Sequence, residues 1–372
     1  MSELLVRREI FAKPRLPVVD VLRVLAANLI VLHHFVAYGP LARALEARLP
    51  QLVTWLFEYG RMAVYVFLVV AGFMSARAFV EWSGSPVVPA LRLIWRRYLR
   101  LVLPLSAALL LAIAAAALAR HWSAEDFIPR PPNLAQFLAH VALLQGVLGV
   151  ESLATGVWYV AIELQLFALM LLLLKVQTGL PRRSLPVFLI TLAMLASWIW
   201  FSRRPELDNW AVYFFGAYAL GILAWWAGCA HFNWQRFAWV LIVAVTTLVL
   251  VHDFRWRMLV ALLTAVTLAR YGLRQWPDQA WAVTFARWLG ERCYAVFLVH
   301  FSVLLGLNAL IDHWPSFAAT HPLRLLAAGW LGSIALGWAF HQWVEVPSMR
   351  LIQNGLPVLG MRRLWVAIRI GG

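Results

Sequence analysis

Long apolar runs alternate along the chain with short segments that carry most of its charges. A helix needs roughly 20 consecutive apolar residues to cross a bilayer core. Runs near this length lie at 18–38, 60–80, 99–119, 156–175, 185–201, 210–228, 236–251, 256–272, 289–311 and 323–343. They predict an all-α, polytopic membrane bundle of about ten transmembrane helices. The shorter stretch 133–150 follows a proline-rich segment and predicts an interfacial or re-entrant helix.

Composition supports a membrane protein rather than a soluble one. Of the 372 residues, 63% are hydrophobic and 13% are charged. In soluble domains about a quarter of all residues are charged. The net charge of +15 would suggest nucleic acid as a partner of a soluble chain. Here the basic residues lie mainly between the apolar runs, so we expect them to orient the helices and to contact anionic membrane lipids. We expect no nucleic-acid binding.

The distribution of basic residues predicts the orientation of the helices. With the N-terminus in the cytoplasm, the cytoplasmic segments hold 21 Lys and Arg residues and the opposite side holds 10. Such an excess marks the cytoplasmic side, so both termini are expected there. The chain then divides into a cytoplasmic tail at 1–17, a membrane domain at 18–345 and a second cytoplasmic tail at 346–372.

Several common kinds of catalytic site have no motif in this sequence. The GxSxG, HExxH, Walker and GxGxxG patterns are absent from any supporting context. Cys229 and Cys293 are far apart and have no neighbours at metal-ligand spacing. We therefore expect no metal site and no permanently bound cofactor.

The first apolar run carries the most ionisable residues, namely Asp20, Arg23, His33 and His34. Such groups are unfavourable inside a membrane and suggest function. His34 lies eleven positions after Arg23, a rotation about 20° beyond three full helical turns. Both residues therefore lie on one face of the helix, roughly 16 Å apart along its axis. The alternative is that Arg23 extends to the membrane surface and that the histidines are hydrogen-bonded core residues.

The fourth run places Glu163 five residues after Trp158. A buried carboxylate needs a charged or hydrogen-bond-donating partner. His34 is expected at a similar depth, and a His34–Glu163 pair would orient the imidazole and make it more basic. The alternative is that the pair only joins two helices.

Two further sets of polar residues remain open to more than one interpretation. Arg96, Arg97 and Arg100 lead into the third run, where they act as a topology signal or as an anion site suited to phosphate. His300 lies within the ninth run, where a packing or channel-lining role is favoured over a directly catalytic one.

Six segments of the chain carry recognisable motifs, in the order VDVLRVLAANLIVLHH, AVYVFLVVAGFMSAR, RRYLRLVLP, TGVWYVAIELQLFAL, LGERCYAVFLVHF and WVEVP. Together they resemble the motifs of the membrane acyltransferase-3 family, and the resemblance extends from about residue 17 to 350. The first matches the family's Asp-x-x-Arg and Arg-x10-His pattern and places the essential histidine at His34 rather than His33. The chain departs from the family pattern at Leu68, Ala71, Cys293 and Phe297.

The resemblance implies transfer of an acyl group, most often acetyl, from cytoplasmic acyl-CoA to a hydroxyl of an extracytoplasmic glycan. The chain would be a multi-pass protein of the bacterial inner membrane, with acetyl-CoA as co-substrate and an exopolysaccharide or lipid-linked sugar as acceptor. Other polysaccharide-biosynthesis proteins would be partners. His34 would act as general base or carry the acyl group. Glu163 would be catalytic with it, orienting His34 or stabilising its charge. The residues that bind CoA would be Arg23, Arg96, Arg97 and Arg100. The supporting residues would be Asp20, Trp158, Tyr294 and His300.

Two rival hypotheses belong to other functional classes. A bundle with buried His, Glu and Arg also suits a proton-coupled transporter or flippase of a glycan precursor. A non-catalytic scaffold within a polysaccharide export complex is the second rival. Transfer of acetyl label from CoA to glycan separates the enzyme from both.

Overall fold

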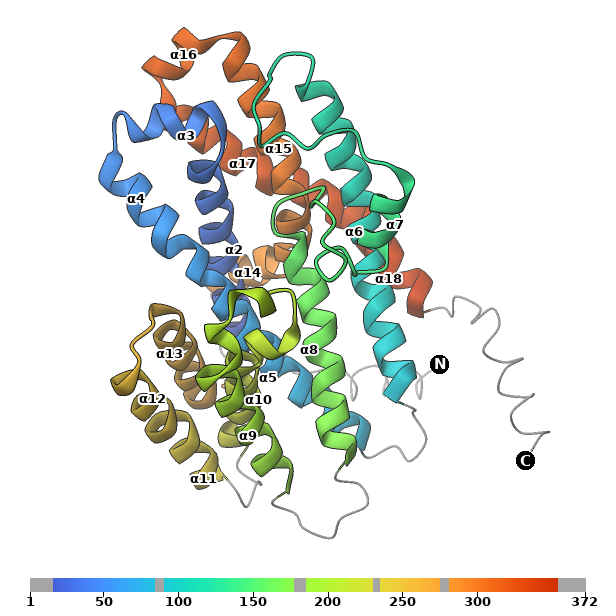
Figure 1. Ribbon diagram of the computed structural model, residues 1–372, viewed down its shortest axis with the longest axis vertical. Coiled ribbons are helices and arrows are strands. Elements are labelled where there is room, and N and C mark those ends of the chain that lie inside the picture. Colours follow the sequence, from blue (N-terminus) through green and yellow to red (C-terminus); the bar gives the residue numbers. More distant parts are fainter. Residues whose placement is uncertain (1–15, 84–89, 177–184, 230–234, 275–280, 354–372) are drawn as a thin grey trace, which may run out of the picture. The chain divides into compact units, whose positions relative to one another are not determined.

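The computed structural model describes residues 16–83, 90–176, 185–229, 235–274 and 281–353, and the regular elements in these ranges are all helices (Figure 1). Nine helical stretches within these ranges are long and apolar enough to cross a membrane. They are α2 (Pro17–Ala37), the stretch Pro50–Phe79 through α4 and α5, α6 (Ala90–Ala119), α8 (Val157–Val176), α9 (Leu185–Ile199) with the 3-10 turn that follows it to Arg203, α10 (Ala211–Gly228), the stretch Gln235–His252 through α11 (Gln235–Val240) and α12 (Thr246–His252), α15 (Cys293–His313) and the stretch Pro322–Gln353 through α17 and α18. The predicted polytopic all-α bundle is confirmed.

The remaining predicted run forms helix α13 (Trp256–Tyr271), which has 16 residues and is shorter than these nine. The stretch at 133–150 forms α7 (Leu134–Val141) followed by turns. Asn133 caps α7, because its side chain accepts a hydrogen bond from the backbone N–H of Gln136.

Some helix boundaries differ from those that hydropathy predicts. Two helices, α3 (Gly39–Glu46) and α4 (Pro50–Tyr59), precede α5 (Ala63–Ser83). The run at 289–311 is divided, since α14 (Trp281–Gly290) ends in a turn before α15 begins at Cys293. The last span comprises α17 (Pro322–Phe340), a π-helical turn (His341–Glu345) and α18 (Val346–Gln353).

The chain forms two compact units, and the first draws on residues 1–30, 61–84 and 172–293. Helix α10 is its most buried span and packs against α5, α9 and α13 (Figure 1). Glycines allow the closest approach: a Cβ at Gly72 of α5 would overlap the Tyr218 carbonyl, and one at Gly221 of α10 would overlap the Val69 carbonyl. Small residues at such crossings let membrane helices pack backbone to backbone.

The second unit draws on residues 31–60, 85–171 and 294–372. In this unit α3 packs against α4 and α17, while α7, α18 and the π-helical turn pack against α6. The α2 residue Phe35 is fully buried against α17, where a Cβ at Gly329 would overlap its ring. The C-terminal part of α2 is thus held within the second unit, and this packing fixes the helix that carries His34.

Candidate active site

Two histidines from distant parts of the sequence meet inside the second unit. His34 on α2 is 8% exposed and His300 on α15 is fully buried. The Nδ1 atom of His34 lies 2.7 Å from Nε2 of His300, and the two rings stack with their centroids 4.9 Å apart. His300 was expected to pack or to line a channel, and the structure shows it to be the hydrogen-bond partner of His34.

The backbone carbonyl of Phe297 determines which nitrogens carry protons. This oxygen lies 2.6 Å from Nδ1 of His300, and a carbonyl can only accept, so Nδ1 of His300 must carry hydrogen. In the neutral ring, Nε2 of His300 is then an acceptor, and Nδ1 of His34 must donate to it. Neutral His34 therefore keeps an unprotonated Nε2, the form that a general base requires.

A glycine lies beside the His34 ring. Gly156 adopts φ +82°, a conformation that other residues rarely tolerate. A Cβ added at this position would lie 3.0 Å from the Phe297 ring and 3.8 Å from Cε1 of His34. Cε1 is bonded to both ring nitrogens, so glycine keeps the space next to this edge of the imidazole free of a side chain.

The neighbouring His33 has a different environment. Its Nδ1 lies 3.1 Å from the backbone carbonyl of Leu56 on α4, to which it donates, and its ring lies 5.7 Å from that of Phe57. This contact joins α2 to α4. The structure therefore gives the two adjacent histidines different partners.

The predicted contact between His34 and Glu163 is wrong. Glu163 on α8 forms its ion pair and hydrogen bond with Arg97 on α6, while His34 bonds to His300. The Arg97 guanidinium also lies over the Phe167 ring, 5.2 Å from its centroid. The expectation used depth along the helices, but a contact also depends on how each helix is rotated about its axis.

The three arginines of α6 do not share one environment. Arg97 is half-buried in its pair with Glu163, whereas Arg96 and Arg100 are exposed. Tyr294 lies nearby, because its hydroxyl donates to the Leu101 carbonyl at 2.9 Å and it interacts electrostatically with Glu163 and Arg97. The structure thus brings Arg97, Glu163 and Tyr294 together.

The other predicted site residues lie elsewhere in the chain. Arg23 is half-buried on α2, eleven residues before His34 on the same continuous helix. Asp20 packs against α14, where a Cβ at Gly290 would lie 2.9 Å from the Asp20 Cβ. Trp158 lies in the first turn of α8 and is partly exposed.

Comparison with known proteins gives the class of this molecule. The family model for the acyltransferase domain of the acyltransferase-3 family matches residues 16–342, which include most of both compact units. No curated protein and no solved structure matches the chain. The chain belongs to the acyltransferase-3 family, and it is a multi-pass membrane protein. The resemblance on which His34 was selected is therefore confirmed as membership.

Sequence reasoning did not find two features of the structure. The role of the Phe297 carbonyl could not be predicted, because every residue type has a backbone carbonyl. A group of arginines at 203, 255 and 257 was interpreted only as part of the charge bias, although it lines a cavity. The close spacing of Asp253, Arg255 and Arg257 was the available signal.

Proposed function

We propose that the protein transfers an acyl group, most often acetyl, from cytoplasmic acyl-CoA to a hydroxyl of an extracytoplasmic glycan. An exopolysaccharide or a lipid-linked sugar is the acceptor class. Family membership supports acyl transfer. The observation that carries the mechanism is the hydrogen-bond chain from His34 through His300 to the Phe297 carbonyl, which leaves Nε2 of His34 as a base.

In this mechanism the acceptor hydroxyl donates its hydrogen bond to Nε2 of His34. The hydroxyl oxygen attacks the thioester carbonyl carbon while Nε2 takes the hydroxyl proton. A C–O bond forms, the C–S bond breaks, and the departing CoA sulfur receives the proton from His34. A base positioned in this way accelerates proton transfer by roughly 10²–10⁴-fold.

His300 acts as a positioning residue in this scheme. Its Nε2 accepts from Nδ1 of His34 both when His34 is neutral and when it is the imidazolium. The ring therefore needs no rearrangement when it gains the proton. The Phe297 carbonyl holds His300 in the matching tautomer at every stage.

The arginines of α6 are the proposed site for the phosphates of CoA, with Arg23 as an additional contact. Guanidinium groups form paired hydrogen bonds with phosphate oxygens. Arg96 and Arg100 are exposed on α6. Glu163 forms an ion pair with Arg97, so we assign it the role of orienting that arginine rather than His34.

The test is label transfer with a His34→Ala variant. Membrane vesicles that contain the protein and its glycan are supplied with labelled acetyl-CoA, and label in the glycan is counted. We expect the rate of label transfer by His34→Ala to be lower by a factor of roughly 10²–10⁴. His33→Ala is the matched control and should keep most of the activity, because His33 bonds to the Leu56 carbonyl instead.

Two results would contradict the proposal. Full activity of a correctly folded His34→Ala protein would remove the assigned base. Absence of label from the glycan with the unmodified protein, combined with glycan movement across the membrane, would favour the transporter.

A further inference from the structure

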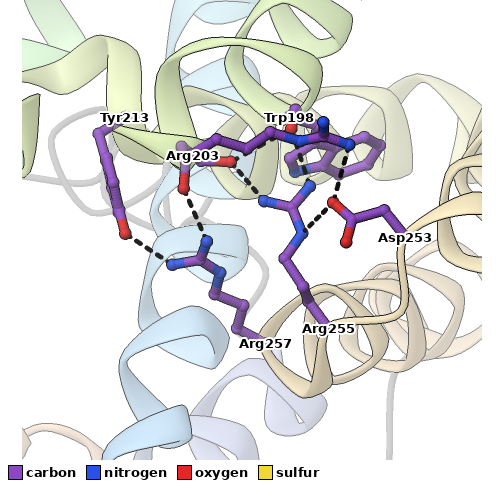
Figure 2. Close-up of polar contacts among 7 residues, drawn as sticks. Trp198, Arg203, Tyr213, Asp253, Arg255 and Arg257 are labelled. Carbon is purple, nitrogen blue, oxygen red and sulfur yellow. Dashed lines mark hydrogen bonds and ion pairs between the residues drawn. The ribbon is translucent and has the colours of Figure 1, made fainter. Parts of the chain in front are cut away.

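A second polar site lies in the first unit, where the ends of four helices meet (Figure 2). The C-terminal ends of α9 and α12 and the N-terminal ends of α10 and α13 border a cavity of about 570 Å³. The lining residues are Ser202, Arg203, Pro205, Tyr213, His252, Asp253, Arg255 and Arg257. Nothing in the proposed acyl transfer uses this cavity.

Hydrogen bonds hold two of the arginines rigidly. Arg255 donates to the Ser202 hydroxyl at 2.7 Å and to the Trp198 carbonyl at 2.8 Å (Figure 2). Arg257 donates to the Tyr213 hydroxyl and to the Ser202 carbonyl, both at 2.7 Å. Neutral groups receive these hydrogen bonds, so they fix the guanidinium groups without neutralising their charge.

The cavity carries an excess of positive charge. Its charged lining consists of three arginines and one carboxylate, Asp253, which lies 3.0 Å from Arg203 and 3.2 Å from Arg255. Burial lowers the pKa of Arg255, and the positive charges of Arg257 and Arg203 lower it further. A bound anion would offset this repulsion, and arginine groups match the oxygens of phosphate.

Aromatic side chains near the cavity indicate the depth at which it lies. Four aromatic residues lie within three positions of a lining residue in the sequence and are each 46–57% exposed, namely Trp200, Trp210, Phe254 and Trp256. Tryptophan is enriched where a membrane protein meets the headgroup region. Exposed aromatic rings beside a positive cavity therefore favour an occupant that has an apolar part and a charged headgroup.

We propose that this cavity binds the phosphate of an anionic lipid headgroup, with Arg203 and Arg255 as its principal contacts. Arginine groups form paired hydrogen bonds with phosphate oxygens, and the phosphate of a lipid headgroup supplies such oxygens. Arg203 is about half exposed and can reach a ligand from the opening, while Arg255 lies deeper. The proposal goes beyond acyl transfer and does not depend on it.

The experiment measures lipid binding by the purified full-length protein in an uncharged detergent. Short-chain phosphatidylglycerol, short-chain phosphatidylcholine and inorganic phosphate are each titrated, and binding is followed through the apparent melting temperature. We expect phosphatidylglycerol to bind most tightly. Arg203→Gln should weaken its affinity about tenfold, since a hydrogen bond to a charged group is lost.

Arg204→Gln is the matched control, because Arg204 does not line the cavity. Its guanidinium carbon lies over the Trp200 ring, 4.2 Å from the ring centroid. The affinity of this variant for phosphatidylglycerol should equal that of the unmodified protein. Arg255→Lys is a second variant that keeps the charge but removes the paired donors, and it should also weaken binding.

Three outcomes would overturn the proposal. In the first, Arg203→Gln and Arg204→Gln bind phosphatidylglycerol with equal affinity. In the second, the protein binds phosphatidylcholine as tightly as phosphatidylglycerol. In the third, it binds inorganic phosphate as tightly as the lipid. The last would assign the cavity to a soluble anion. Because no readout involves acyl transfer, failure of the proposed enzyme activity would leave this result unaffected.

Discussion

At the scale of single residues, burial makes the contact between His34 and His300 informative. Polar groups removed from water are unfavourable unless they form hydrogen bonds. Both nitrogens of the fully buried His300 are used, one by His34 and one by the Phe297 carbonyl. The remaining nitrogen of His34, Nε2, is engaged neither by His300 nor by the Phe297 carbonyl.

This arrangement predicts separable effects of two substitutions at position 300. His300→Phe keeps an aromatic ring but removes the acceptor for Nδ1 of His34, so the tautomer of His34 is no longer fixed. We expect kcat to fall about 10–100-fold with little change in KM for acyl-CoA, as for a group that supports only the chemical step.

His300→Gln should recover part of the lost kcat, because its amide oxygen can accept from His34. The measurement is steady-state label transfer with both variants at equal membrane levels. A role in packing alone would instead make Phe, the larger apolar residue, the better tolerated replacement. That order of activities would contradict the assignment.

The sequence reveals which polar residues lie in apolar helices but not which partners they meet. His34, Glu163 and the α6 arginines could be selected because charged groups are rare in apolar runs. Their pairing depends on helix rotation, and α8 is apolar on all sides, so hydropathy gives Glu163 no preferred direction. Only the folded structure shows that this carboxylate meets Arg97.

At the scale of helices, the crossing of α5 and α10 depends on two glycines. Each glycine faces a backbone carbonyl of the other helix, so an added methyl group would push the helices apart. Backbone atoms cannot move aside as a flexible side chain can. The pair Gly72 and Gly221 therefore sets the distance between these helices.

We expect Gly221→Ala to destabilise the protein by roughly 1–3 kcal/mol, the range for overpacked cores. Gly306→Ala on α15 is the control, since a Cβ there meets nothing within 4 Å and alanine favours the helix. Thermal unfolding in detergent, followed by far-UV circular dichroism, compares the two. A Gly221→Ala protein as stable as Gly306→Ala would contradict the close approach.

Hydropathy located the helices but not all of their ends. The positions of α2, α6, α8, α9 and α10 follow directly from apolar runs of membrane length. The interruption before Cys293 was missed because the residues on both sides are apolar and only Glu291 and Arg292 mark the turn. Helices α3 and α4 were missed because each is short and contains charged residues.

At the scale of the whole molecule, the two units share helix α2, with Arg23 in one and His34 in the other. The orientation of this helix across the membrane decides from which side each residue is reached. The charge bias of the sequence predicts that both chain ends face the cytoplasm. The 1–15 and 354–372 parts of the predicted tails lie outside the described residues.

Cysteine labelling tests this orientation. In a protein with Cys229→Ala and Cys293→Ser, a single cysteine is introduced at Glu206 or at Arg92, both exposed. We expect an impermeant maleimide to label Glu206→Cys in intact cells and Arg92→Cys only after the membrane is opened. The reverse pattern would invert the topology and with it the side from which acyl-CoA enters.

The Phe297 carbonyl has an evolutionary consequence. Because the last acceptor in the series is part of the main chain, every amino acid at this position supplies it. The aromatic ring of residue 297 can therefore change during divergence, as it does here from the family's tyrosine, without loss of the atom that orients His300. In the proposed mechanism, selection on proton transfer would act on the side chains at positions 34 and 300, whereas at position 297 it would act on the backbone alone.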